Sequence, residues 1–324
     1  MTKIRRSTPS NIRVISKATS LVEVLPQDQN LNSEKLGVPK IEIKIEYSSN
    51  PIRNFRMLGA DQEILGNIYT KYGYDFRDYS PELIRRRIRH CMVRENISDL
   101  KTFNDRLLSE KGIFARLVND FSINVSEMFR DPQVWKTLRE EVMPRLATYP
   151  RIRIWSAGTA SGQEAYSLAI MLHELGLYDR SIIYATDLNP MSLHKAQTGQ
   201  YALDKVARYT VNYHRSGGQE DFSQYYSTKP HYAQFDPELK KNIVFSTHSL
   251  EADGVFNEFQ LILCRNVLIY FQNGLISKVL KLFTDSLSAQ GTLCLGAHES
   301  MYPHEEKRYF SQEHPQHKIY RKVF

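Results

Sequence analysis

The stretch IWSAGTASGQEAY at residues 154–166, followed by YATDLN at residues 184–189, decides the fold. An apolar strand runs into a turn bracketed by Gly158 and Gly162, the turn opens a helix, and a second apolar strand ends on Asp187. In a doubly wound α/β sheet, ligands bind at the first strand-to-helix turn, and an acid about 20 residues further on can hold the ribose hydroxyls. The layout therefore predicts a nucleotide-type cofactor site. For the turn taken alone, an ordinary structural turn is the alternative.

The chemistry of the turn favours one class of cofactor. A dinucleotide site has the pattern G-x-G-x-x-G, which lets a pyrophosphate approach the backbone amides at the helix start. The turn Gly158-Thr159-Ala160-Ser161-Gly162 lacks the second glycine, so a pyrophosphate fits it poorly. S-adenosylmethionine has a ribose and an adenine but no phosphate, and its ammonium needs a carboxylate, which Glu164 can supply. The turn therefore predicts S-adenosylmethionine as the cofactor.

Composition limits the class of protein. The 324 residues are 41% hydrophobic and 24% charged, enough for one large core and a second, smaller one. The chain has no apolar run of roughly 18 residues and no apolar segment at its N-terminus, so we expect a cytoplasmic protein without membrane insertion. Cys91, Cys264 and Cys294 are widely spaced, which argues against a disulfide framework and against a zinc site, and no metal is expected. The net charge of +7 indicates an acidic partner, and on charge alone nucleic acid stays open.

The periodicity of apolar residues divides the chain into three parts. Residues 1–54 are predicted to be a mobile basic tail, in which KIEIKIEY at 40–47 alternates like a half-buried strand. Residues 55–147 have helical periodicity and predict an all-helical N-terminal domain. From residue 148 to 324 strands alternate with helices, which predicts a doubly wound parallel sheet of the α/β class. Residues 201–240, rich in tyrosines and polar spacers, interrupt that pattern and predict a small inserted β-subdomain.

The string NVSEMFRDPQVW at residues 124–135 sets polar side chains ahead of an expected helix start. Asn124, Ser126 and Arg130 precede Asp131-Pro132, where the acid is expected to cap the helix and the proline to begin it. A fixed arginine ahead of a cap suggests a binding role. A surface ion pair with a neighbouring acid is the alternative for Arg130.

The string LILCRNVLIYF at residues 261–271 ends a buried strand on a charged and an amide side chain, Arg265 and Asn266. The carboxyl ends of central strands are where ligands bind in open α/β sheets. The alternative is that this pair caps the next helix. His298 and Glu299 follow the last parallel strand, and for them a strand-end pair of hydrogen bonds is expected in place of catalysis.

Together these strings resemble the chemotaxis receptor methyltransferases of the CheR family. IWSAGTASGQEAYS is similar to WSAGCSTGEEPYS of that family, NVSEMFRDPQVW to N-x-T-x-FFRD, YATDLN to ATDID, and LCRNVLIYF to FCRNVLIYF, in the same order between about Tyr69 and Tyr320. The resemblance implies a helical N-terminal domain, an S-adenosylmethionine-dependent methyltransferase domain with an inserted β-subdomain, and methyl esterification of glutamates on a chemoreceptor-like protein, with S-adenosylhomocysteine as product. It implies that the following residues contact the cofactor or line its pocket: Asn124, Ser126, Arg130, Gly158, Glu164, Asp187, Ser249, Leu250, Arg265 and Asn266. Arg130 and Tyr270 are implied to be catalytic, facing the reacting methyl group and the substrate carboxylate.

The sequence departs from the family pattern at three places. It has Gln163-Glu164-Ala165 where the family has two glutamates and a proline, Ser126 where the family has threonine, and Ser249 where the family has asparagine. Losing one neutral hydrogen bond weakens binding by about 0.5 to 1.5 kcal/mol, which lowers affinity before it abolishes chemistry. The departures leave open a cofactor-binding regulatory or scaffold protein with weakened catalysis. A nucleic-acid methyltransferase is a third hypothesis, but the chain lacks the D/N-P-P-Y/W motif of amino methylation.

The expected helix at residues 80–95, SPELIRRRIRHCMVRE, concentrates basic side chains: Arg85, Arg86, Arg89 and Arg94. A solvated helix face is the ordinary explanation of such a run. The resemblance implies instead that this helix meets the acidic methylation helices in the cytoplasmic domain of a receptor, and nucleic acid is not expected as a partner. Family members that tether to a receptor's C-terminal pentapeptide have a glycine in the β-subdomain hairpin. Here that loop is STKPH, so a tether-independent enzyme is expected.

Overall fold

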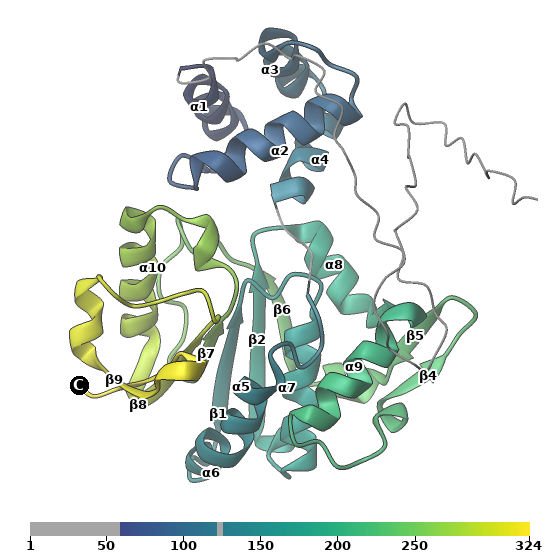
Figure 1. Ribbon diagram of the computed structural model, residues 1–324, viewed down its shortest axis with the longest axis vertical. Helices are drawn as coiled ribbons and strands as arrows, with labels where there is room; N and C mark the ends of the chain where they lie inside the picture. The colour runs from purple at the N-terminus through teal and green to yellow at the C-terminus, as the bar shows by residue number, and fades with distance from the viewer. Residues whose placement is uncertain (1–58, 122–125) are drawn as a thin grey trace, which may run out of the picture. The chain divides into compact units, whose positions relative to one another are not determined.

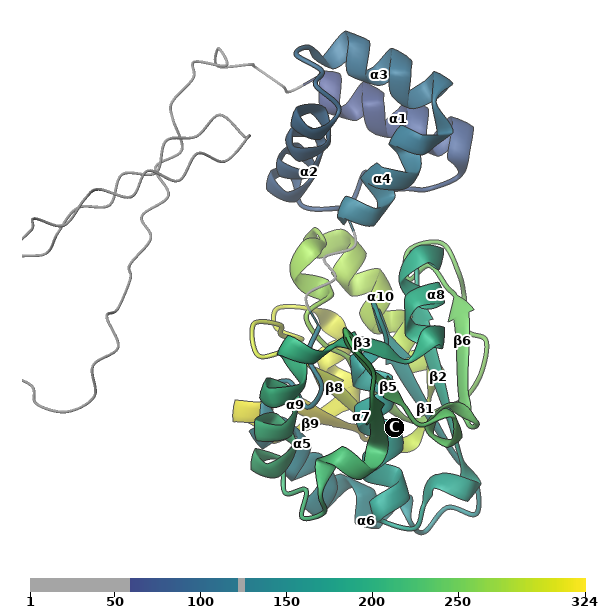
Figure 2. The same ribbon diagram turned by 90° about the vertical axis from the view of Figure 1, so that its right-hand side faces the viewer.

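The computed structural model describes residues 59–121 and 126–324. The predicted tail at 1–54, its strand at 40–47 and the candidate site residue Asn124 lie outside these residues. Figures 1 and 2 show the described elements in two views.

Residues 60–121 fold into helices around a core of their own. These helices are α1 (Ala60–Tyr72), α2 (Pro81–Arg94), α3 (Leu100–Ser109) and α4 (Lys111–Phe121). Gly73 ends α1 in the left-handed conformation, with φ 76°, and Pro81 occupies the first turn of α2 after Ser80, as predicted. The apolar faces meet in a separate cluster that includes Ile68, Phe103 and Leu117, all fully buried.

The second part is built on a seven-stranded sheet among the described residues, in the order β6-β2-β1-β7-β8-β10-β9. The strands β1, β2, β6, β7 and β8 pair in parallel, and β10 pairs antiparallel with both β8 and β9. The order runs outward from β1 in opposite directions to β2 and to β7, which creates a switch point at the carboxyl end of β1. The bounds are β1 Ile152–Ala157, β2 Ser181–Asp187, β6 Ile243–Thr247, β7 Phe259–Cys264, β8 Leu287–Leu295, β9 Phe310–His314 and β10 Ile319–Lys322.

Helices cover both faces of this sheet, because the strands are apolar on both sides. In β1, Ile152 and Ile154 belong to the core cluster that contains α7, whereas Trp155 and Ala157 belong to the cluster that contains α10. The doubly wound α/β arrangement is therefore confirmed. The bounds are α5 Pro132–Thr137, the π-helix η1 Leu138–Val142, α6 Met143–Leu146, α7 Gln163–Glu174, α8 Pro190–Thr198 and α10 Asn273–Ser286. Short 3-10 helices are η2 Tyr178–Arg180, η3 Phe222–Tyr225, η4 Pro237–Lys240, η5 Leu268–Tyr270, η6 Glu305–Tyr309 and η7 Pro315–His317.

The division predicted at residue 147 differs from the packing in the structure. Phe129, Trp135 and Leu138 are buried in the same cluster as Ile154 of the sheet, and not in the cluster of α1 to α4. The amide of Phe129 also donates a 2.9 Å hydrogen bond to Ser167 of α7. Helical periodicity identifies α5 and α6 as helices, but it does not say which core they join.

The inserted segment contains a helix as well as a sheet. Strands β3 (Gln200–Ala202), β4 (Tyr226–Thr228) and β5 (Tyr232–Phe235) form an antiparallel sheet in the order β3-β5-β4, and α9 (Leu203–Arg215) lies between β3 and β4 in the chain. The prediction of a small inserted β-subdomain is confirmed, but the helix was missed. Its signal is present at helical spacing in Val206, Tyr209 and Tyr213, which are buried.

Candidate functional site

Two adjoining cavities lie at the carboxyl ends of β1, β2 and β7, where the sheet topology predicts a ligand. They share Gly158, Ala160, Asn266 and Tyr270 as lining residues. The larger cavity is also lined by Asp187, Ser249 and Leu250, and the smaller one by Ser126, Arg130, Glu164 and Arg265. The structure thus brings together every predicted site residue that it describes.

The glycine turn packs tightly enough to explain both of its glycines. Gly158 and Gly162 are left-handed, with φ 74° and 89°. A Cβ on Gly158 would lie 2.5 Å from Cγ2 of Val267, and one on Gly162 would lie 2.7 Å from Cβ of Ala196. Ala160 between them is also left-handed, with φ 49°. Non-glycine residues in this region store strain and cluster at functional sites.

Asp187 ends β2 with its carboxylate held in place by the turn. Its Oδ2 accepts a 2.8 Å hydrogen bond from the amide of Ala160, and its Oδ1 accepts one of 2.9 Å from the amide of Asn189. Burial raises the pKa of Asp187, and these amides oppose the rise. A carboxylate has about four acceptor sites, so two backbone bonds leave capacity for the two hydroxyls of a ribose.

Glu164 begins α7 and is buried beside a cation. Its Oε1 accepts a 2.8 Å hydrogen bond from Ser156, and its Oε2 lies 3.5 Å from Nη1 of Arg265. Burial raises the pKa of Glu164, and Arg265 opposes that rise. Arg265 favours the carboxylate form of Glu164, which lines the smaller cavity and suits an ammonium.

Arg265 ties the end of β7 to the turn that carries Arg130. Its Nη2 donates to the carbonyl of Arg130 at 2.9 Å and to Oδ2 of Asp131 at 2.8 Å, and its side chain is 2% exposed. Asp131 does precede α5, but its carboxylate takes this ion pair and makes no capping hydrogen bond. The predicted cap is wrong, because a buried guanidinium is a stronger partner than a helix amide.

The turn that presents Arg130 is strained on both sides. Phe129 and Asp131 are left-handed, with φ 51° and 56°. Trp135 adds a second anchor, because its Nε1 donates a 2.9 Å hydrogen bond to the carbonyl of Arg130. The backbone of Arg130 is therefore fixed from two directions while its side chain lines the smaller cavity.

Tyr270 lies where the two cavities meet. Burial raises the pKa of its hydroxyl, and the nearby guanidinium groups of Arg130, Arg87 and Arg86 oppose the rise. The phenol therefore stays protonated and can donate a hydrogen bond at neutral pH.

The loop after β6 brings Ser249 and Leu250 to the larger cavity. Ser249 Oγ accepts a 3.1 Å hydrogen bond from the amide of Ala252, so the hydroxyl is partly engaged by its own loop. Leu250 packs against the core cluster of α10.

Sequence reasoning missed the wall that the helical part contributes. The larger cavity is lined by aromatic and aliphatic residues of residues 76–121, namely Phe76, Tyr79, Val118 and Phe121. Phe76 and Phe121 are stacked with their ring centroids 4.5 Å apart. From the sequence these positions are predicted to be ordinary helix core. Only the folded structure shows that they also face a cavity.

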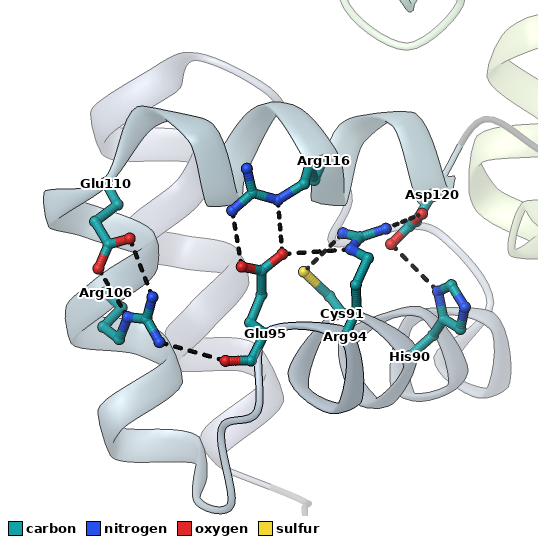
Figure 3. Close-up of polar contacts among 8 residues, drawn as sticks. All are labelled: His90, Cys91, Arg94, Glu95, Arg106, Glu110, Arg116 and Asp120. Atoms are coloured by element: carbon teal, nitrogen blue, oxygen red, sulfur yellow. Dashed lines mark hydrogen bonds and ion pairs between the residues drawn. The ribbon is translucent and has the colours of Figure 1, made fainter. Parts of the chain in front are cut away.

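The basic helix α2 divides into paired and exposed arginines. Arg94 forms ion pairs with Asp120 at 2.9 Å and with Glu95 at 3.3 Å. Glu95 also forms an ion pair with Arg116, as Figure 3 shows. Arg85 pairs with Asp61 at 3.0 Å. Arg86 and Arg89 are exposed to solvent. Two of the four arginines singled out from the sequence are therefore engaged in holding the helices together.

Two other predictions from composition concern the thiols and the membrane. Cys91, Cys264 and Cys294 form no disulfide, as predicted, and all three are buried, which raises the pKa of each thiol. Among residues 59–121 and 126–324, the helices are all too short or too polar to cross a bilayer.

Comparison with known proteins matches both parts of the chain. The family model described as CheR methyltransferase, all-alpha domain, matches residues 61–122, and the one described as CheR methyltransferase, SAM binding domain, matches residues 124–319. The chain is 46% identical over 234 residues to the Pseudomonas putida protein that is named a methyltransferase, Cher3, covering 72% of this chain and 86% of that protein. It is 33% identical over 231 residues to a chemotaxis protein methyltransferase of Listeria innocua, covering 71% and 85%.

Proposed function

The chain belongs to the CheR methyltransferase family and carries its S-adenosylmethionine-binding domain, and on that premise we propose that it methylates glutamate side chains of a chemoreceptor-like protein. The product would be a glutamate methyl ester. The observation that carries the proposal is the meeting of Glu164, Asp187, Arg130 and Tyr270 around two joined cavities.

The cavities fit the parts of the cofactor one by one. Asp187 has acceptor capacity left for the ribose hydroxyls, and the apolar wall of the larger cavity suits an adenine. Glu164 suits the ammonium of the methionine end. In this proposed pose the sulfonium methyl would lie near the junction of the cavities, beside Tyr270. We propose that the other lining residues Ser126, Gly158, Ser249, Leu250 and Asn266 contact the cofactor, and that Arg265 acts through the turn it holds.

The reaction needs alignment more than it needs acid or base catalysis. A glutamate has a pKa near 4.3 in water, so at neutral pH its carboxylate is already the nucleophile. One carboxylate oxygen attacks the methyl carbon, the carbon–sulfur bond breaks with its electron pair going to sulfur, and the cofactor leaves as a neutral thioether. Alignment of such reactants can supply roughly 7 to 11 kcal/mol.

Arg130 and Tyr270 are the proposed catalytic residues. The guanidinium of Arg130 would orient the carboxylate by two-point hydrogen bonding. A tight ion pair would quench the nucleophile, so orientation in the transition state is the useful contribution. The protonated hydroxyl of Tyr270 would hold the reacting end of the cofactor in line.

We propose that the receptor docks on the exposed face of α2 through Arg86 and Arg89. Methylation helices rich in glutamate are acidic, and exposed arginines attract such a surface and speed its encounter. The receptor domain concerned is cytoplasmic, and the protein would act in that compartment.

The test incubates the protein with methyl-labelled S-adenosylmethionine and membranes from its own organism. We expect label on a membrane protein that mild base releases as methanol, the behaviour of a carboxyl methyl ester. The double variant Arg86→Glu, Arg89→Glu should raise the KM for the receptor, whereas Lys101→Glu, Lys111→Glu, which changes the same charge on α3 and α4, should not. Label that resists base would contradict ester formation.

A cofactor-binding regulatory protein without turnover is the second candidate, and Gln163 favours it. Gln163 stands where the family has a glutamate, and it is buried with its Oε1 accepting a 2.9 Å hydrogen bond from Ser161. A protein that binds S-adenosylhomocysteine in calorimetry but never labels a receptor would be this candidate. Asp187→Ala should weaken that binding by about 1.5 to 3 kcal/mol in either case.

A further inference from the structure

A buried carboxylate after β8 organises the segment between β7 and Tyr270. Glu299 is 4% exposed. Its Oε1 accepts hydrogen bonds of 2.7 Å from the amides of both Val267 and Leu268. Its Oε2 accepts one of 3.1 Å from the amide of Asn266 and another from the amide of Gly296. One side chain therefore satisfies four backbone donors, three of them consecutive.

Two of these amides, those of Val267 and Leu268, are ones that a helix start leaves without partners. The 3-10 helix η5 begins at Leu268, and its first N–H groups have no carbonyl within the helix to bond. A capping side chain is normally local in the sequence. Here the cap comes from 31 residues further along the chain, so it also fixes the loop after β8 against the end of β7.

The residues held by Glu299 belong to the candidate site. Asn266 and Val267 line the larger cavity, and the amide of Tyr270 bonds the carbonyl of Val267 at 3.1 Å. Asn266 is left-handed, with φ 62°, a conformation that the surroundings must enforce. The tight packing of Val267 against Gly158 leaves little room for a shift of this segment.

We propose that Glu299 is a positioning residue for methyl transfer, holding Asn266 and Val267 against the cofactor and setting the start of the helix that carries Tyr270. This inference rests on the proposed function. It assigns Glu299 a role beyond the strand-end hydrogen bonds that the sequence predicts for it.

The charge and shape of a glutamate are both needed at this position. A glutamine keeps one oxygen, but in either orientation its NH₂ would face two of the four N–H groups, donor against donor. Burial raises the pKa of Glu299, and its four backbone donors oppose that rise. A buried donor left without an acceptor is strongly unfavourable, so the segment would move to satisfy itself elsewhere.

Glu299→Gln is the primary variant and Glu174→Gln is its matched control. Glu174 also has a carboxylate with little exposure, 9% for the side chain, and several donors, Tyr225 at 2.9 Å and Arg139 at 2.6 Å among them, but it lines neither cavity. The readouts are the Kd for S-adenosylhomocysteine by calorimetry, kcat and KM for S-adenosylmethionine, and the Tm of each variant.

We expect Glu299→Gln to raise the Kd about tenfold or more and to lower kcat, measured well below its Tm. Glu174→Gln should lower the Tm and leave the Kd within about twofold. Gly296→Ala gives a second route, because its Cβ would lie 2.7 Å from both the amide nitrogen of Asn266 and Oε2 of Glu299. Gly296→Ala should show the same rise in Kd while the carboxylate of Glu299 is kept. It tests the role of Glu299 if Glu299→Gln does not fold.

Folded Glu299→Gln with Kd and kcat within about twofold of wild type would overturn the inference, as would Gly296→Ala with wild-type values where Glu299→Gln does not fold. A binding defect equal in Glu174→Gln would also overturn it, since the effect would then be general destabilisation. Failure of the wild-type protein to bind S-adenosylhomocysteine would instead contradict the proposed function.

Discussion

The backbone amide of Ser80 donates a 2.8 Å hydrogen bond to the carbonyl of Tyr270. Gln272 extends this clip, because its amide bonds the carbonyl of Asp78 at 2.9 Å and its side chain bonds the carbonyl of Tyr79 at 3.0 Å. The start of α2, the helix proposed to receive the receptor, is therefore joined directly to the segment of the proposed catalytic tyrosine.

Because the backbone of Tyr270 is clamped on both sides, Tyr270→Phe should remove the hydroxyl without moving the ring. We expect kcat to fall about tenfold or more, with the Tm and the Kd for S-adenosylhomocysteine almost unchanged. The change in kcat is measured from initial rates at saturating cofactor. A kcat equal to that of wild type would remove the hydroxyl from the mechanism.

Substitutions of Arg130 and of Arg265 should affect different properties, turnover in the first case and stability in the second. The carbonyl of Arg130, and not its side chain, accepts the bonds from Arg265 and Trp135. Arg130→Ala keeps that carbonyl anchored and should lose most turnover, with a smaller loss of Tm than Arg265→Met, and Arg130→Lys should stay poor because an ammonium lacks the planar two-point grip. Arg265→Met removes a buried guanidinium that holds the carbonyl of Arg130 and pairs with Asp131 and Glu164, so it should lower the Tm more than Arg130→Ala does. Equal losses of Tm in Arg130→Ala and Arg265→Met would contradict this division.

Gly158→Ala should damage the cofactor site. The residue is left-handed, and the added Cβ would lie 2.5 Å from Val267, so the turn or the segment held by Glu299 must shift. We expect a loss of cofactor affinity in calorimetry. Gly274→Ala is the matched control, since its Cβ meets nothing within 4 Å, and its effect should stay within about 0.5 kcal/mol. Equal affinities of the two variants would show that the turn tolerates a side chain.

Glu251 should make stability depend on pH. It is buried, and burial together with Asp75 and Asp78 raises its pKa to about 7, against the opposing charges of Lys278 and Arg77. A carboxyl whose pKa is higher in the folded state stabilises the fold at low pH, and that stabilisation is lost as pH rises through the folded pKa.

Urea unfolding should show this loss between roughly pH 5 and pH 8, at up to about 1.4 kcal/mol per unit of pKa difference. Glu251→Gln should be less sensitive to pH over that range, whereas Glu258→Gln, at an exposed site, should follow wild type. Parallel pH profiles for wild type and Glu251→Gln would refute the prediction.

Local patterns in the sequence predicted the crevice well, because its parts are set by local geometry. The glycine turn, the acid that ends β2 and the alternation of strands with helices all follow from periodicity and steric rules. Contacts between residues far apart in the sequence could not be predicted from these local patterns. Arg265 lines the smaller cavity, as expected, but the sequence did not show that its Nη2 also holds Asp131 and the carbonyl of Arg130, partners 134 and 135 residues away.

The same limit explains the other differences. Phe76 and Phe121 look like helix core in the sequence, and they are core, but they also face a cavity that only the folded chain creates. Glu299 caps η5 from a distant loop, so no local capping pattern in the sequence predicts this role. The helix α9 was hidden because its tyrosines suit a strand as well as a helix.

The most direct test of the account is to find the modified atom. A purified receptor cytoplasmic domain, incubated with S-adenosylmethionine and the protein, would be digested and read by tandem mass spectrometry before and after mild base. The account predicts that a glutamate gains the mass of one CH₂ group, that base removes it, and that Arg130→Ala leaves the receptor unmodified. A methyl group found on a lysine, an arginine or a nucleic-acid base, or no transfer to any receptor by a protein that binds the cofactor, would contradict it.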